Sequence, residues 1–469
     1  RAILAFSLIA ASSLAKRLIQ FDDFPAAAQR LLAKQGVDER RFDGYTRSIN
    51  IRTEARMLEG ENDHLIYYVL QSRRFTRQPG IEPALSAYAF VQELTADEKS
   101  RYWNDSSYLP PIERLPQPVF LRFQDFTRVL KKSGTWDRSA RDERLVYFQD
   151  FIQKNKNASE SLVQYLYRQY ARSMKFLYQK EFSAQKNVKK RHAEPLRLAV
   201  DISSLYQTRG HSTDTQIEAN FAVYIALGAL KAERPALQLN KVLIVGPGID
   251  FAPRTDLMDI FGPQSYQPYA VADALFAFKL AALDRVRIDC VDINDRVVRF
   301  VDEFSREESR RLALISGVAD NAKHSFTAEY RDYFKQLGKS IGFESPLDNL
   351  PSAYASRLKK SILVKRDLAG KVSAGKLNII TERYDPSPGY DLIVVTNVFL
   401  YFNDKEILLS LANIESMMKK GAYLIHNEPR QNLVSFAALY ALPVVQARTV
   451  LIAPGETPLY DTVWVHRRQ

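Results

Sequence analysis

The stretch KVLIVGPGID, residues 241–250, decides the fold class of this chain. A short apolar run ends here in a loop with two glycines, which is typical of a buried strand that leads into a ligand-binding turn. Four further apolar runs follow, separated by segments with helical spacing. They are VRIDCVD (286–292), LNIIT (377–381), DLIVVT (391–396) and AYLIHN (422–427). Short apolar runs that alternate with helices predict a parallel sheet with crossover helices.

The end of the chain breaks this alternation. ARTVLIAP (447–454) and YDTVWVHRR (460–468) have the pattern of strands, and only GETPL (455–459) joins them. A linker this short has no room for a helix, so the two strands are predicted to form an antiparallel hairpin at the sheet edge. A dinucleotide-binding dehydrogenase would instead continue with strand and helix. The predicted fold class is therefore α/β, a Rossmann-like sheet of parallel strands closed by an antiparallel hairpin.

The chain is long enough for more than one folding unit, since its 469 residues exceed a typical domain of about 150. Residues 21–200 carry apolar residues three and four positions apart, as in DHLIYYVLQSRRF (63–75), which predicts a mainly helical domain. Aromatic residues on these helices fit a core better than a substrate groove. The sheet domain would cover residues 201–469. Within it, residues 250–266 lengthen the first crossover and residues 306–370 form an insertion.

The ends of the first two strands carry the first candidate ligand-binding residues. Gly246 and Gly248 let the backbone turn tightly beneath a ligand that a side chain would obstruct. Asp292 closes the second strand, where its carboxylate can accept hydrogen bonds from both ribose hydroxyls of a nucleoside. The alternative is that this acidic stretch only caps a helix, a role open to Asn294 and Asp295 as well.

Three more candidates follow the third and fourth strands. Glu382 is placed where an acidic group can face an adenine ring, or it is only a solvated loop residue. Asn397 and Tyr401, in TNVFLYF (396–402), follow the fourth strand at the carboxyl edge, where ligands bind in open α/β sheets. Asn397 would present its amide to cofactor or substrate unless it is a structural cap, and Tyr401 would share its helical face. Both are candidate catalytic residues.

A polar loop precedes the helix that leads into the first strand. The loop is YQTRGHSTDT (206–215), and with Gly210 amid polar side chains it can fold over a ligand. His211 is a candidate base there, although a lone histidine in a polar loop is more often simply exposed. The six histidines of the chain are scattered without ligand spacing, so no metal site is predicted.

At these positions the chain resembles the chemoreceptor protein-glutamate methyltransferases. The most specific match is YDLIVVTNVFLYF (390–402), which is similar to the family's FDLIFCRNVLIYF. GAYLIHNE (421–428), VDIN (291–294) and QPYAVADAL (267–275) resemble further family segments. The likeness covers discontinuous parts of the C-terminal half.

The resemblance implies a class I methyltransferase domain of a bacterial type, with S-adenosylmethionine as its cofactor. Asp292 would bind the ribose, Glu382 would fall where the family has an adenine-side Asn, and Asn397 would contact the cofactor. The acceptor would be a protein carboxylate or a small molecule rather than a nucleic acid, and a carboxylate would need no general base. The cofactor site would comprise Gly246, Pro247, Gly248, Asp292, Ile293, Glu382 and Asn397.

The chain departs from the family pattern in three places. Thr396 replaces an Arg, Gln267 replaces an acidic residue, and the segment 250–266 is additional. The helical region also lacks a recognisable receptor-binding signature. The resemblance therefore supports the fold and the cofactor better than it supports a chemoreceptor substrate.

Charge and cysteine content bear on possible anionic partners and on disulfide bonds. Lys and Arg number 66 against 54 Asp and Glu, a net charge of +12. Part of the excess lies in AQKNVKKRH (184–192), which can meet an anionic partner but fits a solvated linker better, because no nucleic-acid fold signature accompanies it. Cys290 is the only cysteine, which excludes a disulfide framework within the chain, and its apolar strand predicts a core position.

The first 20 residues, RAILAFSLIAASSLAKRLIQ, allow two interpretations. Their apolar run has the length of a signal peptide and is too short for a comfortable membrane span, and an amphipathic helix fits as well. S-adenosylmethionine is kept in the cytoplasm, so an active enzyme would be cytoplasmic. The alternative is an exported or membrane-anchored binding protein with a degenerate methyltransferase fold, in keeping with Asp250 in place of a third glycine.

Overall fold

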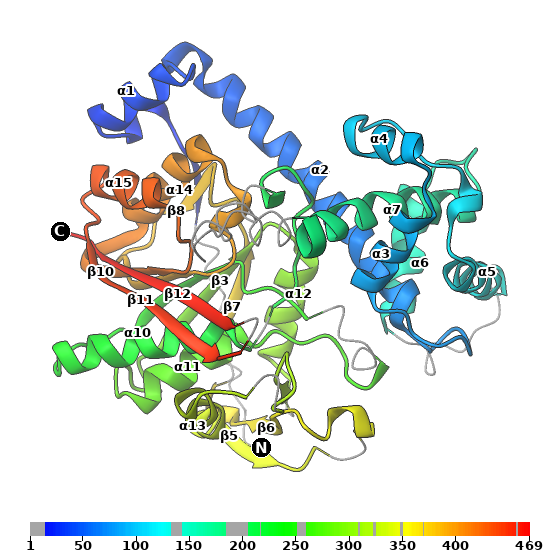
Figure 1. The fold of residues 1–469 in the computed structure, drawn as a ribbon. Helices are drawn as coiled ribbons and strands as arrows, with labels where there is room; N and C mark the ends of the chain where they lie inside the picture. The colour runs from blue at the N-terminus through cyan, green and yellow to red at the C-terminus, as the bar shows by residue number, and fades with distance from the viewer. Residues whose placement is uncertain are drawn as a thin grey trace, which may run out of the picture.

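The computed structural model describes residues 15–132, 143–183, 205–215, 217–250, 259–307, 310–321, 325–347, 350–368, 370–455 and 458–469. A central sheet with helices on both faces forms the sheet domain (Figure 1). Beside it lies a bundle of helices, and below it a small second sheet (Figure 1).

Seven strands form the central sheet in the order β11-β12-β10-β9-β2-β3-β7. Neighbours from β10 to β7 are parallel, whereas β12 runs antiparallel to both β10 and β11. The predicted α/β class and the edge hairpin are thus confirmed. The strands are β2 (Lys241–Val245), β3 (Arg287–Asp292), β7 (Val372–Lys376), β9 (Tyr390–Val395), β10 (Met418–His426), β11 (Val444–Ala453) and β12 (Leu459–Arg467).

Side chains of the central strands alternate between two apolar layers, as the period of a strand requires. Val242 and Ile244 of β2 belong to the core on one face, and Leu243 and Val245 to the core on the other. The first core includes helices α10 (Ala219–Glu233), α11 (Gln267–Ala277) and α12 (Asp295–Phe304). The second includes α1 (Ala26–Lys34), α14 (Asp404–Met417) and α15 (Gln431–Leu439). Burial of both faces explains the continuous apolar runs of the sequence.

One predicted strand is wrong. Residues 377–381 are not a strand of the sheet; they follow β7, whose sequence is VSAGK. β7 is the edge strand, so its small and polar residues give no apolar run. Leu377, Ile379 and Ile380 are apolar because they are buried beyond the end of that strand.

A single long helix joins the sheet domain to the helical bundle. α2 (Glu39–Gln71) has 33 residues and is therefore about 50 Å long. Its Phe42 and Ile49 pack in the core shared with α14, and its residues 65–70 pack in the bundle. We call this end of α2, together with the five helices that follow, the helical lobe. These helices are α3 (Pro83–Glu93), α4 (Ala96–Asn104), α5 (Gln117–Lys132), α6 (Glu143–Asn155) and α7 (Leu162–Tyr178).

The insertion after α12 builds the small antiparallel sheet, in the order β4-β6-β5. Its elements are β4 (Arg310–Ile315), α13 (Ala328–Gln336), β5 (Gly342–Ser345) and β6 (Lys359–Val364). The carboxylate of Asp273 on α11 accepts hydrogen bonds from the backbone N–H groups of Gly338 and Ser340, both at 2.8 Å. These bonds fix the insertion to the sheet domain.

The N-terminal segment is described from residue 15, and Lys16–Leu18 form strand β1 rather than a helix. β1 pairs with β8 (Glu382–Tyr384). Residues 1–14, the basic run 184–192 and residues 251–258 of the lengthened crossover lie outside the described residues. Cys290 is buried in β3.

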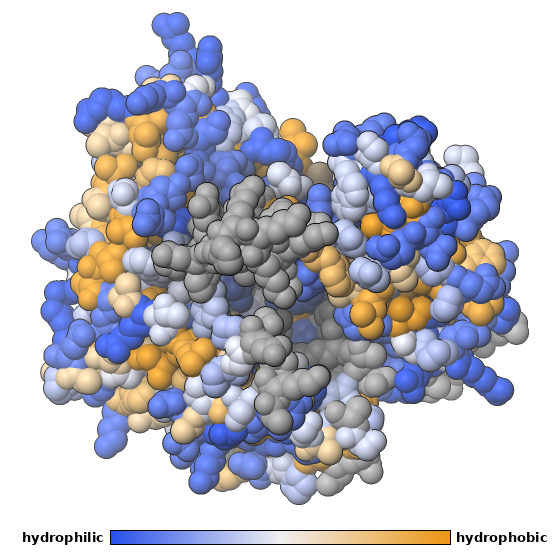
Figure 2. Space-filling model, in the orientation of Figure 1, coloured by the Kyte–Doolittle hydropathy of each residue, from blue (hydrophilic) through white to orange (hydrophobic). Residues whose placement is uncertain are grey.

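Among the described residues, no helix has the length and apolar character needed to cross a membrane. On the face shown in Figure 2, hydrophilic residues predominate, and hydrophobic ones form small separate patches on the sheet domain and on the helical lobe.

Candidate functional site

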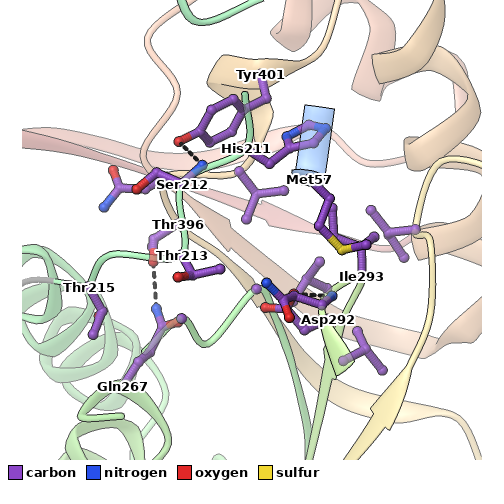
Figure 3. Close-up of a pocket in the computed structure, with 18 of the residues that line it drawn as sticks. Met57, His211, Ser212, Thr213, Thr215, Gln267, Asp292, Ile293, Thr396 and Tyr401 are labelled. Atoms are coloured by element: carbon purple, nitrogen blue, oxygen red, sulfur yellow. Dashed lines mark hydrogen bonds between the residues drawn. The ribbon is translucent and has the colours of Figure 1, made fainter. Parts of the chain in front are cut away.

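A cavity opens at the carboxyl ends of the parallel strands, above β2 and its two neighbours in the sheet, β3 and β9. It holds about 930 Å³ of space, counting its solvent-open mouth. Its walls come from the ends of these strands, from the loop 206–215 and from α2 (Figure 3). Ligands of open α/β sheets bind at such a switch point.

The glycine loop forms the floor of this cavity. Gly246 and Gly248 both line it and both have positive φ, at 67° and 69°. A Cβ on Gly246 would lie 2.6 Å from a Val398 methyl, and one on Gly248 would lie 2.8 Å from the Thr213 carbonyl oxygen. Backbone conformation and space therefore both require glycine here. Pro247, between them, is not among the residues that line the cavity.

Asp292 and Ile293 line the wall next to the floor (Figure 3). Burial raises the pKa of Asp292 to about 7, although the backbone N–H of Asn294 and the charge of Arg296 pull it down. The N–H of Asn294 donates to the Asp292 carboxylate at 2.8 Å. Asn294 itself caps α12 by accepting from the N–H of Arg296 at 2.9 Å. The cap is thus Asn294, and the Asp292 carboxylate faces the cavity.

The wall beyond β7 is formed by residues 377–380, and Asn378 is its polar member. Its amide nitrogen donates to the side-chain amide oxygen of Asn50, on α2, at 2.9 Å. Glu382 does not line the cavity; its carboxylate accepts from the N–H of Asn378 at 2.9 Å and lies 3.8 Å from Lys16. The expectation that Glu382 faces an adenine is therefore wrong in this structure. The misplaced third strand shifted the predicted wall by four residues.

Asn397 and Tyr401 line the cavity, but they do not share a helical face. Asn397 has a φ of 56°, Tyr401 ends a short turn, and α14 begins only at Asp404 with Asn403 as its cap. The Asn397 amide oxygen accepts from Asn427 at 2.8 Å. The Tyr401 hydroxyl accepts from the N–H of Ser212 at 3.2 Å (Figure 3).

α2 holds the polar loop over the cavity. The guanidinium of Arg56 donates to the carbonyl oxygens of Arg209, Tyr401 and Tyr206 at 2.7, 3.0 and 2.8 Å. Gly60 and Gly210 let the loop cross the helix in backbone contact, since a Cβ on either would collide with the other chain segment. One arginine therefore ties both sides of the cavity mouth to a single helix.

His211 lies in this loop and lines the cavity, buried rather than exposed. Its ring centroid is 5.0 Å from that of Tyr401. Burial and the nearby Arg56 hold the pKa of His211 well below its usual value. The imidazole is thus neutral at pH 7 and can accept a proton or hydrogen bond.

A buried ionic network lies behind the cavity, between α2 and the loop. Glu61 accepts from Arg296 at 2.8 Å, and His64 lies 3.4 Å from the Asp214 carboxylate. Burial lowers the pKa of His64, but Asp214 and Glu61 outweigh it and raise this pKa to about 9. His64 is therefore an imidazolium at neutral pH, and it keeps Asp214 ionised.

Two of the three departures from the family pattern, Gln267 and Thr396, line this cavity and contact each other. The amide of Gln267 donates to the Thr396 hydroxyl at 2.5 Å (Figure 3). Two neutral side chains thus hydrogen-bond to each other at positions where the family pattern has an Arg and an acidic residue.

A second cavity of about 1480 Å³, again with its mouth, continues from the first toward the helical lobe. The two share five lining residues, Ser212, Asp214, Thr215, Asn397 and Tyr401. The helical lobe supplies the far wall from α2, α3 and α7. The arrangement places a nucleoside-sized site and a larger open site side by side, with a polar junction between them.

Sequence reasoning missed the contribution of α2. Thr53 and Met57 line the first cavity, and Tyr67 lines the second. The helix was evident from its spacing, but nothing in the spacing distinguishes a residue that faces a cavity from one that faces a core.

No protein-family model matches the chain, and no curated protein matches it in sequence. Among solved structures, the chain is similar to the N-methyltransferase NodS of Bradyrhizobium japonicum with S-adenosylhomocysteine, at 11% identity and a TM-score of 0.28, covering 58% of this chain and 98% of NodS. It is also similar to the magnesium protoporphyrin IX methyltransferase of Synechocystis with bound S-adenosylmethionine, at 8% identity and a TM-score of 0.27, covering 62% and 94%. Such matches do not decide the activity or the acceptor of this chain. Its own strand order, β11-β12-β10-β9-β2-β3-β7, and its edge hairpin form the Rossmann-like sheet that the sequence predicts.

Proposed function

We propose that this chain is an S-adenosylmethionine-dependent methyltransferase. The observation that carries the proposal is the continuity of the two cavities at the carboxyl edge of the sheet. One has the glycine floor and the carboxylate that suit a nucleoside, and the other is large enough for an acceptor.

The residues of the first cavity fit the cofactor. Gly246 and Gly248 line the floor with backbone alone, and the Asp292 carboxylate can accept from a ribose diol. Asn378 offers an amide on the next wall. When bound, the cofactor supplies an electrophilic methyl group on a sulfonium.

The residues at the junction position the acceptor. Tyr401 and Asn397 border both cavities, and burial raises the pKa of Tyr401, so its phenol stays protonated. Holding the acceptor atom in line with the methyl group supplies most of the acceleration in such a transfer. The resemblance to glutamate methyltransferases implies a carboxylate acceptor, which stays a prediction. Activity further requires the cytoplasmic cofactor, so we place the active protein in the cytoplasm.

Calorimetric titration of S-adenosylmethionine into the full chain tests the proposal. We expect micromolar binding that Asp292→Ala abolishes. Asp295→Ala is the matched control, because Asp295 lies three residues further on, is exposed and pairs only with Lys376 among the described residues. A folded protein that does not bind the cofactor would refute the proposal and favour a binding protein without catalysis.

A further inference from the structure

We propose that the second cavity takes an acceptor that carries an amine, and that the chain is an N-methyltransferase of a cationic amine. This inference rests on the proposed function and adds the class of its acceptor. It rests on the charges, the aromatic walls and a hydroxyl of the second cavity.

Carboxylates outnumber cations around the second cavity. Five acidic residues line its described part, namely Asp63, Glu82, Glu181, Asp214 and Asp250. Three basic residues line it, namely His64, Lys180 and Arg209. With His64 charged, the lining carries a net charge of about −2, which attracts a cation into the cavity.

Each of these cations already contacts a carboxylate. Lys180 lies 3.1 Å from Glu181, Arg209 pairs with Asp63, and His64 pairs with Asp214. The pairing leaves an excess of two carboxylates over the cations among the described lining residues, so an anionic acceptor would enter a site of like charge. Like charges brought together in such a site cost binding free energy, so a carboxylate acceptor is disfavoured.

Tyr67 places a hydroxyl in the second cavity where a ligand can hydrogen-bond to it. Its side chain is buried, with 7% exposed, and it lines the second cavity. No described residue hydrogen-bonds to its hydroxyl, whose environment includes the Asp214 carboxylate and the Tyr206 and Tyr401 rings. The hydroxyl is not among the buried polar atoms without a partner, so it opens to the cavity and can hydrogen-bond to a bound acceptor there.

Aromatic walls complete a site for an ammonium group. Tyr67, Phe176, Tyr206 and Tyr401 all line the cavity. Aromatic faces together with carboxylates stabilise an ammonium by cation–π and ionic attraction. Asp214 contributes to the ionic part at the junction of the two cavities, where one of its oxygens lies 3.4 Å from His64 and the other accepts from Ser212 at 3.0 Å.

The reaction balances with water as the proton acceptor. The bound ammonium loses one proton to solvent at the cavity mouth. The amine lone pair then forms the new C–N bond while the C–S bond breaks, and its electron pair stays on sulfur. The products are a methylated ammonium, S-adenosylhomocysteine and the released proton.

Two probes of similar shape and opposite charge test this inference. Phenethylamine and hydrocinnamate are titrated separately into the full chain saturated with S-adenosylhomocysteine, and binding is followed by ligand-observed NMR. We expect phenethylamine to bind at least about tenfold more tightly than hydrocinnamate. Tyr67→Phe should weaken phenethylamine about threefold to tenfold, because one hydrogen bond is lost.

Tyr88→Phe is the matched control, since Tyr88 lies on α3, is 47% exposed and does not line either cavity. Neither change should alter binding of S-adenosylhomocysteine, which is measured first. If that ligand binds but hydrocinnamate binds as well as phenethylamine, or neither probe binds, the amine inference is overturned and the proposed function stands. If the ligand itself does not bind to folded protein, both fall.

Discussion

Cofactor binding should depend on pH through Asp292. Its carboxyl has a pKa of about 7 in the ligand-free protein because burial disfavours the charged form. Only the ionised carboxylate can accept from both ribose hydroxyls, so binding pulls this pKa down. Affinity should therefore increase as the pH rises through 7 and decrease below it.

The magnitude follows from the pKa. A carboxyl of pKa about 7 is roughly nine-tenths protonated at pH 6 and one-tenth protonated at pH 8. If the protonated form binds poorly, the apparent affinity falls about tenfold from pH 8 to pH 6. Binding at pH 6 should also release close to one proton.

Stability of the ligand-free protein changes in the opposite sense. A raised pKa means that the native state holds this proton more tightly than the unfolded chain does. The penalty that Asp292 imposes on the native state is therefore smallest near pH 4, grows as the pH rises toward 7 and is constant above that. This is the sign expected of a carboxylate whose hydrogen-bond donors arrive with a ligand.

Calorimetry of S-adenosylhomocysteine at pH 6, 7 and 8, in buffers of different ionisation enthalpy, measures both quantities. Asp292→Asn is the reference, because an amide cannot ionise, and its weaker binding should not vary with pH. An affinity that is constant from pH 6 to 8, or a pH dependence that persists in Asp292→Asn, would refute the role assigned to this carboxyl.

Three further changes test the scaffold. Gly246→Ala should lower the unfolding free energy by about 1–2 kcal/mol and abolish cofactor binding, because φ is positive at this position and a Cβ would meet a Val398 methyl group. Gly262→Ala is the control, since a Cβ there meets no atom within 4 Å, and it should change neither property. Denaturant titrations measure the stability of both variants. Arg56→Lys should lower the unfolding free energy by about 2 kcal/mol and raise the KM for the cofactor, because an ammonium group cannot reproduce the geometry in which the guanidinium bonds to three carbonyl oxygens. An unchanged KM would contradict this. The His426 and His466 rings have ring nitrogens 2.9 Å apart, and burial holds the pKa of both below the usual value. Thermal unfolding should therefore show stability lost as the pH falls below about 6.5, and a smaller loss in His466→Gln.

Most strands of the central sheet could be predicted because burial on both faces is visible in the sequence of each strand alone. Strands buried on both faces must be apolar throughout, so β2, β3, β9 and β10 are visible as runs. The edge hairpin is visible because its linker is too short for a helix. β7 was missed because a sheet edge tolerates small and polar residues, and the apolar residues after it are buried against other segments.

The site residues that lie at or after the ends of strands could be predicted, whereas those that α2 contributes could not. Gly246, Asp292, Asn397 and Tyr401 follow strands directly, and all of them line the first cavity. The prediction for Glu382 was wrong because the third strand was predicted at residues 377–381, whereas β7 ends at Lys376. Their binding and catalytic roles stay predictions until a ligand is measured.

The contribution of α2 explains why the helical lobe belongs to the function rather than to a separate unit. The same helix lines the first cavity through Met57, ties the loop and Tyr401 together through Arg56, and lines the second cavity through Tyr67. A stiff helix of about 50 Å cannot shift at one of these points without shifting at the others. One helix thus contributes to the walls of both cavities and holds the loop between them.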